Sequence, residues 1–359
     1  MKTKPYGIVS DQHFHNWSAF SSVKECGINS RLNEQLAELR RCADETRKVG
    51  GNLIINAGDT FHIRGNLPPS VLNPVLDLHK ELIREGFDIL VLAGNHDAEN
   101  KEVTRLSSAV TALESVGCKV FNETTFFSGS ETSYTGFWFI PWQQNIEKLK
   151  EEIEKISSDG LTNKRTLIIH APVDDVIVGI PNHGLNSSYL AKFNFNKVFS
   201  GHFHHYKDFG NGVYSIGSTT HHTWSDVNTK AGFLVVDGED VKWFKSHAPE
   251  FVEIDSATDP AEIPMIVDGN YVRIKTSATD ITEIEGIREL LIDNGAKGVT
   301  IISQREASVS PRGTASVASG MSLEASVSDY VSKGGFDDPK ALEGLCVSIL
   351  SKAKETEGV

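Results

Sequence analysis

Short apolar runs alternate with helix-like patterns over the first 250 residues. Each apolar run ends in glycine or a polar residue, which predicts buried strands over residues 6–10, 52–58, 88–94, 166–171 and 197–202. Apolar positions spaced three or four apart predict helices over residues 31–49, 70–85, 103–116 and 145–157. This alternation of strand and helix is typical of an α/β layered domain.

Three later runs have the spacing of hairpins: GVYSIG, GFLVVD and VKWF, at residues 212–217, 232–237 and 241–244. We therefore expect a second, more antiparallel layer that packs against the first. The predicted fold class of residues 1–250 is α/β.

The pattern changes beyond residue 250. A strand, a helix and a second strand predict a small α+β domain over residues 251–305. Residues 306–322 are rich in serine, alanine and glycine without periodicity, which predicts a flexible linker. Two short amphipathic helices are expected over residues 323–359, and the sequence leaves open whether they pack back on the domain or dock a partner.

Length and composition agree with this organisation. A chain of 359 residues favours one large domain plus a smaller one, and 39% hydrophobic with 23% charged residues is ordinary for a globular protein. No apolar stretch reaches the roughly 18 residues of a membrane helix, and the N-terminal residues run straight into a strand instead of a signal-peptide core. We expect a cytoplasmic protein without a membrane partner.

The formal net charge of −13 is unevenly distributed. Residues 250–359 hold 10 basic and 19 acidic side chains, and the rest of the chain holds 25 and 29. This balance excludes a strongly basic coating protein but agrees with a metal-dependent enzyme that acts on phosphates, because bound cations change the local charge. The four cysteines form no CxxC pair and are expected to be reduced thiols.

Side chains of metal-ligand type follow all five predicted strands. The carboxyl ends of strands are where open α/β sheets bind ligands, and residues spaced i, i+2 on extended chain project to one side. Mixed carboxylates and imidazoles suit Mn²⁺, Fe²⁺ or Zn²⁺ better than Ca²⁺, and the absence of thiols argues against structural zinc. The candidates are Asp11, His13, Asp59, Asn95, His96, Asp97, His170, His202 and His204.

Taken singly, each candidate has an ordinary explanation. Asp59 alone is more often a turn or helix-cap residue, and His170 alone is more often a buried core histidine. Their concurrence at five strand ends, in one order, outweighs these explanations and predicts a metal centre.

The ordered set D-x-H, GD, GNH[DE], H and GHxH resembles the calcineurin-like metallophosphoesterase family over residues 6–205. The resemblance implies a two-sheet sandwich flanked by helices, followed by a small C-terminal α+β cap domain and terminal helices. It also implies two divalent metal ions, most often Mn²⁺, at roughly the 3.5–4 Å separation of two-metal phosphoryl-transfer sites. By this resemblance the first metal is held by Asp11, His13 and His204, the second by Asn95, His170 and His202, and Asp59 bridges them.

Two further residues receive catalytic roles, His96 from the family pattern and Asp97 from its position next to His96. His96 is not a ligand in the family pattern and is expected to act as an acid or to stabilise the transition state. Asp97 is expected to orient His96, because an adjacent carboxylate holds the tautomer of an imidazole and raises its pKa.

The segment GDTFH at residues 58–62, followed by IRGNLPPSVL, resembles the SbcD-type nuclease subunits. In that group the histidine at the position of His62 lies over the metals and helps to place the DNA backbone. The resemblance implies a DNA nuclease with 3′-to-5′ exonuclease and single-strand endonuclease activity, which forms a homodimer and binds an SbcC-type coiled-coil ATPase through its final helices. The compact chain suits a bacteriophage recombination nuclease that works in the host cytoplasm.

The sequence leaves two other functions open. A small-molecule or cyclic-nucleotide phosphodiesterase or phosphatase has the same core motifs, and a non-catalytic scaffold would keep the fold without the ligands. The segment GSTTHHTWSD at residues 217–226 departs from the relatives. Histidines expected near the pocket or on the surface, and not as ligands, are His15, His205, His221 and His222, and those expected to be structural or exposed are His79, His183 and His247.

Overall fold

The computed structural model describes residues 4–25, 27–100, 102–128, 136–158, 160–255, 257–278, 280–303, 323–333, 336 and 338–356. The linker predicted for residues 306–322 and Cys26 lie outside these residues. Two compact units are present: the first contains Met1–Lys275 and Ile284–Ile302, and the second contains Thr276–Glu283 and Ser303–Val359. The domain boundaries expected from the sequence stay a prediction.

The first sheet contains six strands in the order β12-β11-β1-β2-β3-β4. The strands β1 to β4 are parallel, and the hairpin β11–β12 joins them antiparallel to β1. The hairpin thus extends the first sheet, so the expectation that it forms the second layer is wrong. The bounds are Tyr6–Val9 for β1, Leu53–Asn56 for β2, Asp88–Leu92 for β3, Lys119–Phe121 for β4, Gly232–Asp237 for β11 and Asp240–Lys245 for β12.

The second sheet also contains six strands, in the order β5-β6-β7-β8-β10-β9. Its central strands β6, β7, β8 and β10 are parallel, so this layer is less antiparallel than the hairpin spacing predicted. The central strand β6 was not predicted from the sequence. The bounds are Thr125–Phe127 for β5, Gly136–Ile140 for β6, Arg165–His170 for β7, Lys197–Gly201 for β8, Lys207–Asp208 for β9 and Val213–Ser215 for β10.

Alternating side chains along each strand fill different core layers. Leu53 and Ile55 of β2 lie in the core between the two sheets, whereas Ile54 lies in the core under the first helices. In β7, Ile168 faces the central core, and its neighbours face the helices of the second sheet. Because both faces of each sheet are buried, these strands read as continuous apolar runs.

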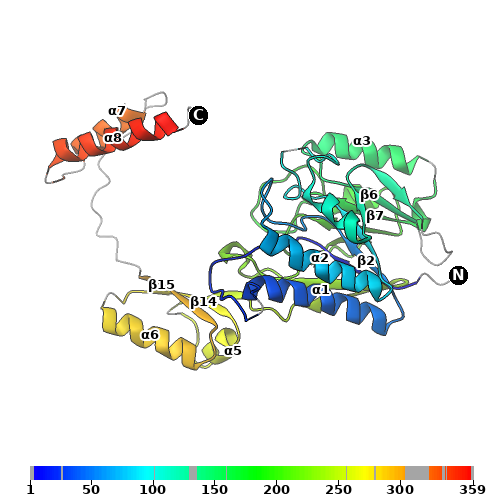
Figure 1. Cartoon of the computed structure of the whole chain (residues 1–359), viewed down its shortest axis with the longest axis horizontal. Helices are drawn as coiled ribbons and strands as arrows, with labels where there is room; N and C mark the ends of the chain where they lie inside the picture. The colour runs from blue at the N-terminus through cyan, green and yellow to red at the C-terminus, as the bar shows by residue number, and fades with distance from the viewer. Residues whose placement is uncertain are drawn as a thin grey trace. The chain divides into compact units, whose positions relative to one another are not determined.

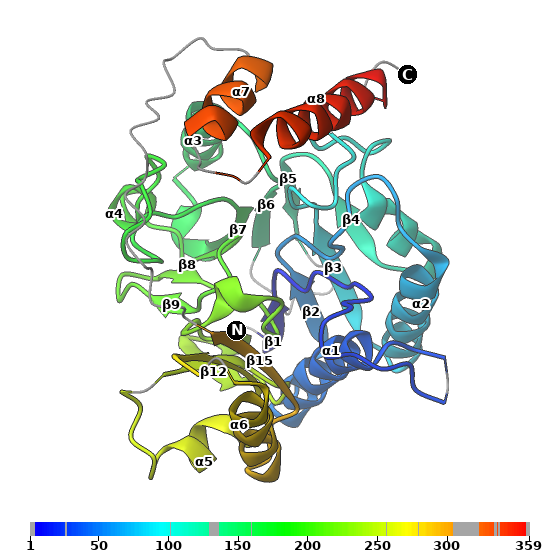
Figure 2. The same ribbon diagram turned by 90° about the vertical axis from the view of Figure 1, so that its left-hand side faces the viewer.

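Helices cover the outer face of each sheet. Figure 1 shows α1 and α2 side by side, and Figure 2 shows the two sheets with α1 and α2 outside the first and α3 and α4 outside the second. This helix–sheet–sheet–helix order is the predicted sandwich. The bounds are Ser30–Lys48 for α1, Pro69–Arg84 for α2, Ile146–Ser157 for α3 and Ser187–Ala191 for α4.

The helix expected over residues 103–116 is shorter and tighter than predicted. A 3₁₀ helix, η1, covers only Ala109–Val116. Before it, Thr104 and Ser107 bond each other's backbone N–H groups through their hydroxyls, at 3.1 and 3.2 Å. Such local bonds compete with the helical pattern, which delays the start of the helix.

The strand–helix–strand region beyond residue 250 forms a three-stranded sheet in the order β13-β14-β15. Ile254, Val267, Val272 and Leu291 are buried in its own core. Its elements are β13 Phe251–Ile254, α5 Ile263–Val267, β14 Tyr271–Thr276, α6 Ile281–Asp293 and β15 Gly298–Ser303.

Two terminal helices, α7 Leu323–Lys333 and α8 Pro339–Thr356, pack against each other. Short 3₁₀ helices η2 and η3 occupy Thr162–Lys164 and Trp224–Asp226. Among the residues that the structure describes, no helix combines the length and the apolar character required to cross a membrane.

Candidate metal centre

The carboxyl ends of five strands from both sheets meet at one place. The loops after β1 and β2 run together, because the backbone N–H of Asp11 donates to the carbonyl of Gly58 and that of His13 donates to the carbonyl of Asp59, both at 3.0 Å. All seven residues predicted as metal ligands are brought together here: Asp11, His13, Asp59, Asn95, His170, His202 and His204.

Four of these residues adopt a left-handed backbone conformation. The φ angle is +48° at Asp11, +45° at His13, +52° at Asp59 and +104° at His202. Non-glycine residues rarely adopt such values, and each costs roughly 1–3 kcal/mol. Half of the eight described non-glycine residues with a positive φ angle are thus candidate ligands.

Glycines before the ligands allow the strand ends to approach closely. A Cβ atom on Gly94 would lie 2.2 Å from Oδ1 of Asp59, and one on Gly58 would lie 2.3 Å from Nδ1 of His170. Only a residue without a side chain fits at either position. The glycines of the GD and GNH motifs are therefore part of the geometry of the site.

The atoms predicted to hold the first metal converge around His13. Its Nε2 lies 3.2 Å from Nε2 of His204 and 3.5 Å from Oδ2 of Asp59. The ligand atoms of Asp11, His13 and Asp59 all lie within 4.8 Å of one another. The carboxylate of Asp11 also accepts the backbone N–H of His202 at 2.9 Å, which joins the ends of β1 and β8.

The atoms predicted to hold the second metal converge around Asn95. Its Oδ1 lies 3.0 Å from both Nε2 of His170 and Nδ1 of His202. Asp59 connects the two sets, because its Oδ2 also lies 3.4 Å from Nε2 of His170. This position between the sets is the one expected of a bridging carboxylate.

The hydrogen bonds of His170 test whether a cation fits. Its Nδ1–H donates to the carbonyl of Ala57 at 2.9 Å, so in the neutral ring the lone pair of Nε2 is directed at the oxygens of Asn95 and Asp59. A lone pair that faces two acceptors is satisfied by a positive charge between them. A histidine held through its second nitrogen by a carbonyl is also the usual arrangement at metal sites, so these residues fit a divalent ion.

The electrostatics of the buried site favour positive charge beside Asp59. Burial alone would lower the pKa of His170, but the Asp59 carboxylate outweighs it and raises this pKa to about 9. Burial lowers the pKa of His13 well below its ordinary value and that of His202 to about 3. Neutral imidazoles are the form that binds metals, so His13 and His202 are in the binding state at neutral pH.

His62 and His96, the predicted catalytic histidines, lie together beside His13. Nδ1–H of His96 donates to the carbonyl of His62 at 2.7 Å, and the two rings stack with centroids 5.4 Å apart. The backbone N–H of His96 also donates to Oδ1 of Asp59 at 2.8 Å. His62 lies within metal-ligand distance of this group, because the ligand nitrogens of His13, His62 and His96 are all within 4.8 Å of one another.

Asp97 has partners other than the one expected. His96 receives its orientation from the carbonyl of His62 and not from Asp97, because the tight turn after β3 directs the two neighbouring side chains to different partners. Burial raises the pKa of Asp97 to about 7. Its carboxylate accepts three backbone N–H groups at 2.9–3.3 Å, those of Gly94, Phe61 and Thr60.

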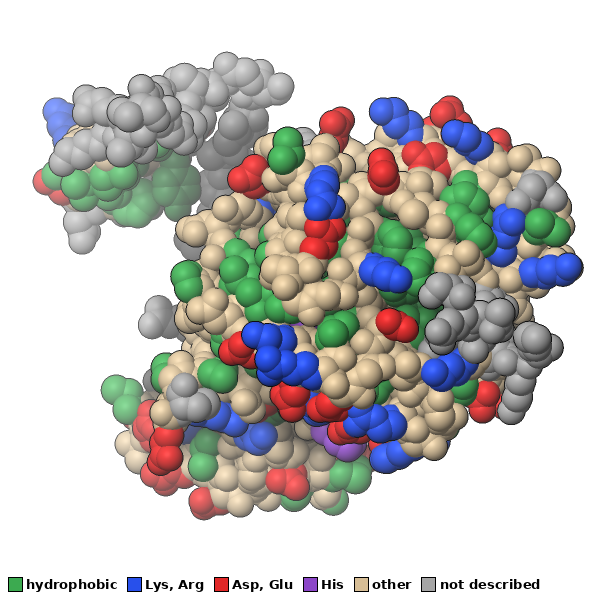
Figure 3. All heavy atoms as spheres, turned by 45° about the vertical axis from the view of Figure 1, so that its right-hand side comes forward, with side chains coloured by type: hydrophobic (Ala, Val, Ile, Leu, Met, Phe, Trp, Pro, Cys, Tyr) green, Lys and Arg blue, Asp and Glu red, His purple; other side chains and the backbone are tan. Residues whose placement is uncertain are grey.

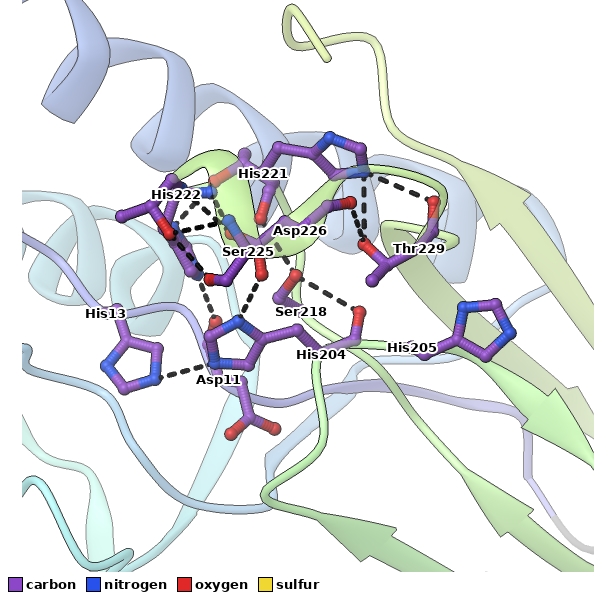
Figure 4. A network of polar contacts seen from close by, with 12 residues as sticks. Asp11, His13, His204, His205, Ser218, His221, His222, Ser225, Asp226 and Thr229 are labelled. Atoms are coloured by element: carbon purple, nitrogen blue, oxygen red, sulfur yellow. Dashed lines mark hydrogen bonds and ion pairs between the residues drawn. The ribbon is translucent and has the colours of Figure 1, made fainter. Parts of the chain in front are cut away.

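Sequence reasoning missed Asp226, which contacts a predicted ligand. Nδ1–H of His204 donates to Oδ1 of Asp226 at 2.7 Å, and Figure 4 shows this contact within a polar network that includes Asp11 and His13. The sequence contained one sign of this residue, the T-x-x-D spacing of Thr223 and Asp226, which is typical of a capping box and forms one at η3. The departure noted at residues 217–226 thus contains a residue of the site.

The other histidines vary in burial. His222 is buried, and its Nε2–H donates to the carbonyl of Asp11 at 3.0 Å, so this nitrogen is not free for a metal in the arrangement described. His79 is buried in α2 and donates to the carbonyl of Val75, which is a structural role. His15 and His205 are half-buried beside the site.

The part of the chain that contains these residues is similar to a known protein family. A family model described as calcineurin-like phosphoesterase matches residues 4–206, which include every predicted ligand. The chain belongs to the calcineurin-like phosphoesterase family. Membership implies binding of divalent metal, and the His/Asp groups of the described residues offer the ligands.

Two curated relatives of this phosphoesterase are named as an exonuclease subunit and as a DNA repair protein. "Exonuclease subunit 1" of Enterobacteria phage T4 is 24% identical over 212 residues, covering 57% of this chain and 58% of the relative. "DNA double-strand break repair protein Mre11" of Methanococcus maripaludis is 23% identical over 223 residues, covering 58% of this chain and 57% of the relative. The matches thus span less than two thirds of either relative.

Among solved structures, a dimetal phosphatase from Danio rerio has a TM-score of 0.43 and 11% sequence identity. The alignment covers 68% of this phosphoesterase and 100% of the phosphatase.

Proposed function

We propose that this phosphoesterase is a Mn²⁺-dependent DNA nuclease that acts as a 3′-to-5′ exonuclease and a single-strand endonuclease. The observation that carries the proposal is the convergence of seven ligand-type side chains from five strand ends, with the stacked pair His62 and His96 beside them. The names of the two curated relatives support DNA as the substrate class.

In this proposal Asp11, His13 and His204 would hold one metal, Asn95, His170 and His202 would hold the other, and Asp59 would be shared by both. Bound divalent cations would supply positive charge that polarises the phosphoryl oxygens and lowers the pKa of an attacking water.

Two residues of the chain would then act on the substrate: His96 on the leaving oxygen and His62 on the DNA backbone. Nδ1–H of His96 is used by the carbonyl of His62, so Nε2 is the nitrogen available to hold a proton for the leaving oxygen. His62 is half-buried, and burial lowers its pKa to about 4, so its ring is neutral at physiological pH. We assign it the positioning of the DNA backbone.

The surface charge favours DNA contact through the metal centre over contact through a broad basic area. On the face drawn in Figure 3, basic and acidic side chains are interspersed and do not gather by sign, and the formal net charge of the chain is −13. Binding that depends on few phosphate contacts would have a weak salt dependence. Affinity for DNA would then come from bound cations and from a partner subunit.

We propose that the partner is an SbcC-type coiled-coil ATPase that binds the terminal helices, and that the nuclease forms a homodimer. On α8, Leu345 and Ile349 lie one turn apart and are 60% and 58% exposed, which suits burial by a partner helix. The word "subunit" in the name of the phage T4 relative also supports an assembly.

The test is a nuclease assay on end-labelled linear DNA with Mn²⁺, with and without EDTA. Asp59→Asn and His96→Ser should each abolish metal-dependent cleavage, and the exposed control Asp208→Asn should retain it. The same assay is run in parallel with bis-p-nitrophenyl phosphate and with cyclic nucleotides. A turnover on these compounds that exceeds the turnover on DNA would identify a small-molecule phosphodiesterase. Unchanged DNA cleavage in both site variants would overturn the proposal.

A further inference from the structure

We propose that Asp226 is a positioning residue that fixes the proton of His204 on Nδ1 and thereby keeps Nε2 available to a metal ion. The inference rests on the metal-binding part of the proposed function and is independent of the substrate. It assigns a role to the loop after β10, which the family motifs do not cover.

The contact between the two side chains is short and protected. Nδ1 of His204 lies 2.7 Å from Oδ1 of Asp226, whose exposed fraction is 2%. A carboxylate only accepts hydrogen bonds, so the proton of a neutral His204 must lie on Nδ1. Nε2 then carries the lone pair, and this atom lies 3.2 Å from Nε2 of His13, another predicted ligand of the first metal.

Asp226 is itself held in place by its own loop. Its Oδ2 accepts the backbone N–H groups of His222 at 2.7 Å and Thr223 at 2.9 Å. The hydroxyl of Thr223 caps the same N-terminal end of η3 by accepting the N–H of Ser225 at 3.3 Å. Oδ2 of Asp226 therefore accepts hydrogen bonds from the loop, and Oδ1 accepts the hydrogen bond from His204 (Figure 4).

The loop is also tied to elements outside it. Nδ1 of His221 accepts the backbone N–H of Phe251 in β13 at 3.0 Å. The buried guanidinium of Arg31 in α1 donates to the carbonyl of His222 at 2.7 Å and to that of His221 at 3.2 Å. These bonds do not involve a metal, so the loop holds Asp226 toward His204 before any ion binds.

A simpler explanation is that Asp226 only caps η3. The two explanations differ in what an amide at position 226 should do. Asparagine can still accept one backbone N–H through Oδ1, but its NH₂ group can donate to Nδ1 of His204. The proton of His204 would then move to Nε2, which blocks the lone pair that the metal requires.

The experiment compares Asp226→Asn with Thr223→Ala in the full chain. Mn²⁺ binding is measured by electron paramagnetic resonance and calorimetry, and thermal unfolding of the metal-free proteins reports folding. We expect Asp226→Asn to weaken one of two Mn²⁺ sites by roughly 10- to 100-fold. Thr223→Ala, which loosens the cap without contacting His204, should keep both sites within about threefold.

The outcomes separate this inference from the proposed function. Equal loss of Mn²⁺ in both variants, or full Mn²⁺ affinity in Asp226→Asn, would overturn the positioning role. Absence of Mn²⁺ binding in the unmodified protein would instead overturn the metal centre itself. If Asp226→Asn folds poorly, ¹⁵N spectra of histidine-labelled unmodified protein still decide, because a neutral His204 with its proton on Nε2 and none on Nδ1 contradicts the inference.

Discussion

Replacing Gly94 with alanine tests whether the close approach of the strand ends creates the metal centre. Gly94 is buried after β3, and an added Cβ would lie 2.2 Å from Oδ1 and 2.3 Å from the backbone nitrogen of Asp59. Real Cβ atoms do not approach other atoms so closely. Since one of the two contacted atoms is backbone, a side-chain rotation cannot relieve the clash, and the loop after β2 must move.

The size of the effect follows from this geometry. Overpacking of a dense interior typically costs about 1–3 kcal/mol, and 1 kcal/mol lowers the melting temperature of a domain of this size class by about 2–4 °C. We therefore expect Gly94→Ala to lower the melting temperature by about 2–12 °C. Displacement of Asp59 should also weaken Mn²⁺ binding by roughly tenfold or more, since small shifts at supporting residues have effects of that size.

The assay is thermal unfolding of the metal-free protein, followed by a Mn²⁺ titration. Gly286→Ala is the matched control, because Gly286 lies exposed in α6 with no atom within 4 Å of an added Cβ. Alanine there should stabilise the helix by about 0.5–1 kcal/mol. If Gly94→Ala matches the unmodified protein in both melting temperature and Mn²⁺ affinity, a Cβ atom fits between the strand ends. This result would refute the prediction of a clash with Asp59.

Two further predictions concern residues around the ligands. His62→Ser should reduce exonuclease turnover by roughly tenfold or more while the Mn²⁺ content stays unchanged, because the role proposed for its ring is to place the substrate. A loss of metal in elemental analysis would instead make His62 a ligand. Arg31→Met should lower the free energy of unfolding in urea by about 2–4 kcal/mol, because it leaves the buried carbonyls of His221 and His222 without their donor. The control Arg105→Met removes an exposed salt bridge and should leave stability unchanged.

The predicted ligands were accessible from sequence because the strands that carry them are buried on both faces. Such strands read as short apolar runs, and the first polar residue after each run marks the edge of the sheet. In β2 the run ends at Asn56, and Asp59 follows within three residues. Periodicity does not show which strand ends lie close together in space, and the family pattern supplies this information.

The missed elements lack such a signal. The five residues of β6, Gly136–Ile140, form an apolar and aromatic run that periodicity cannot distinguish from a buried helical segment. The hairpin β11–β12 was found, but its neighbour β1 lies more than 220 positions away along the chain, in a pairing that puts Tyr6 opposite Val236. Local pattern carries no information on that pairing, so the hairpin was assigned to the wrong layer.

Asp97 and Asp226 show why residues that support a ligand are harder to predict than the ligands. Adjacency suggested that Asp97 orients His96, yet the turn after β3 sends this carboxylate to backbone N–H groups of the loop after β2. Asp226 is 22 positions from His204 but touches it. A motif fixes the identity of a ligand, whereas its orientation depends on the path of neighbouring loops. The carbonyl of His62 orients His96, so a displacement of the loop after β2 would move both proposed catalytic histidines together.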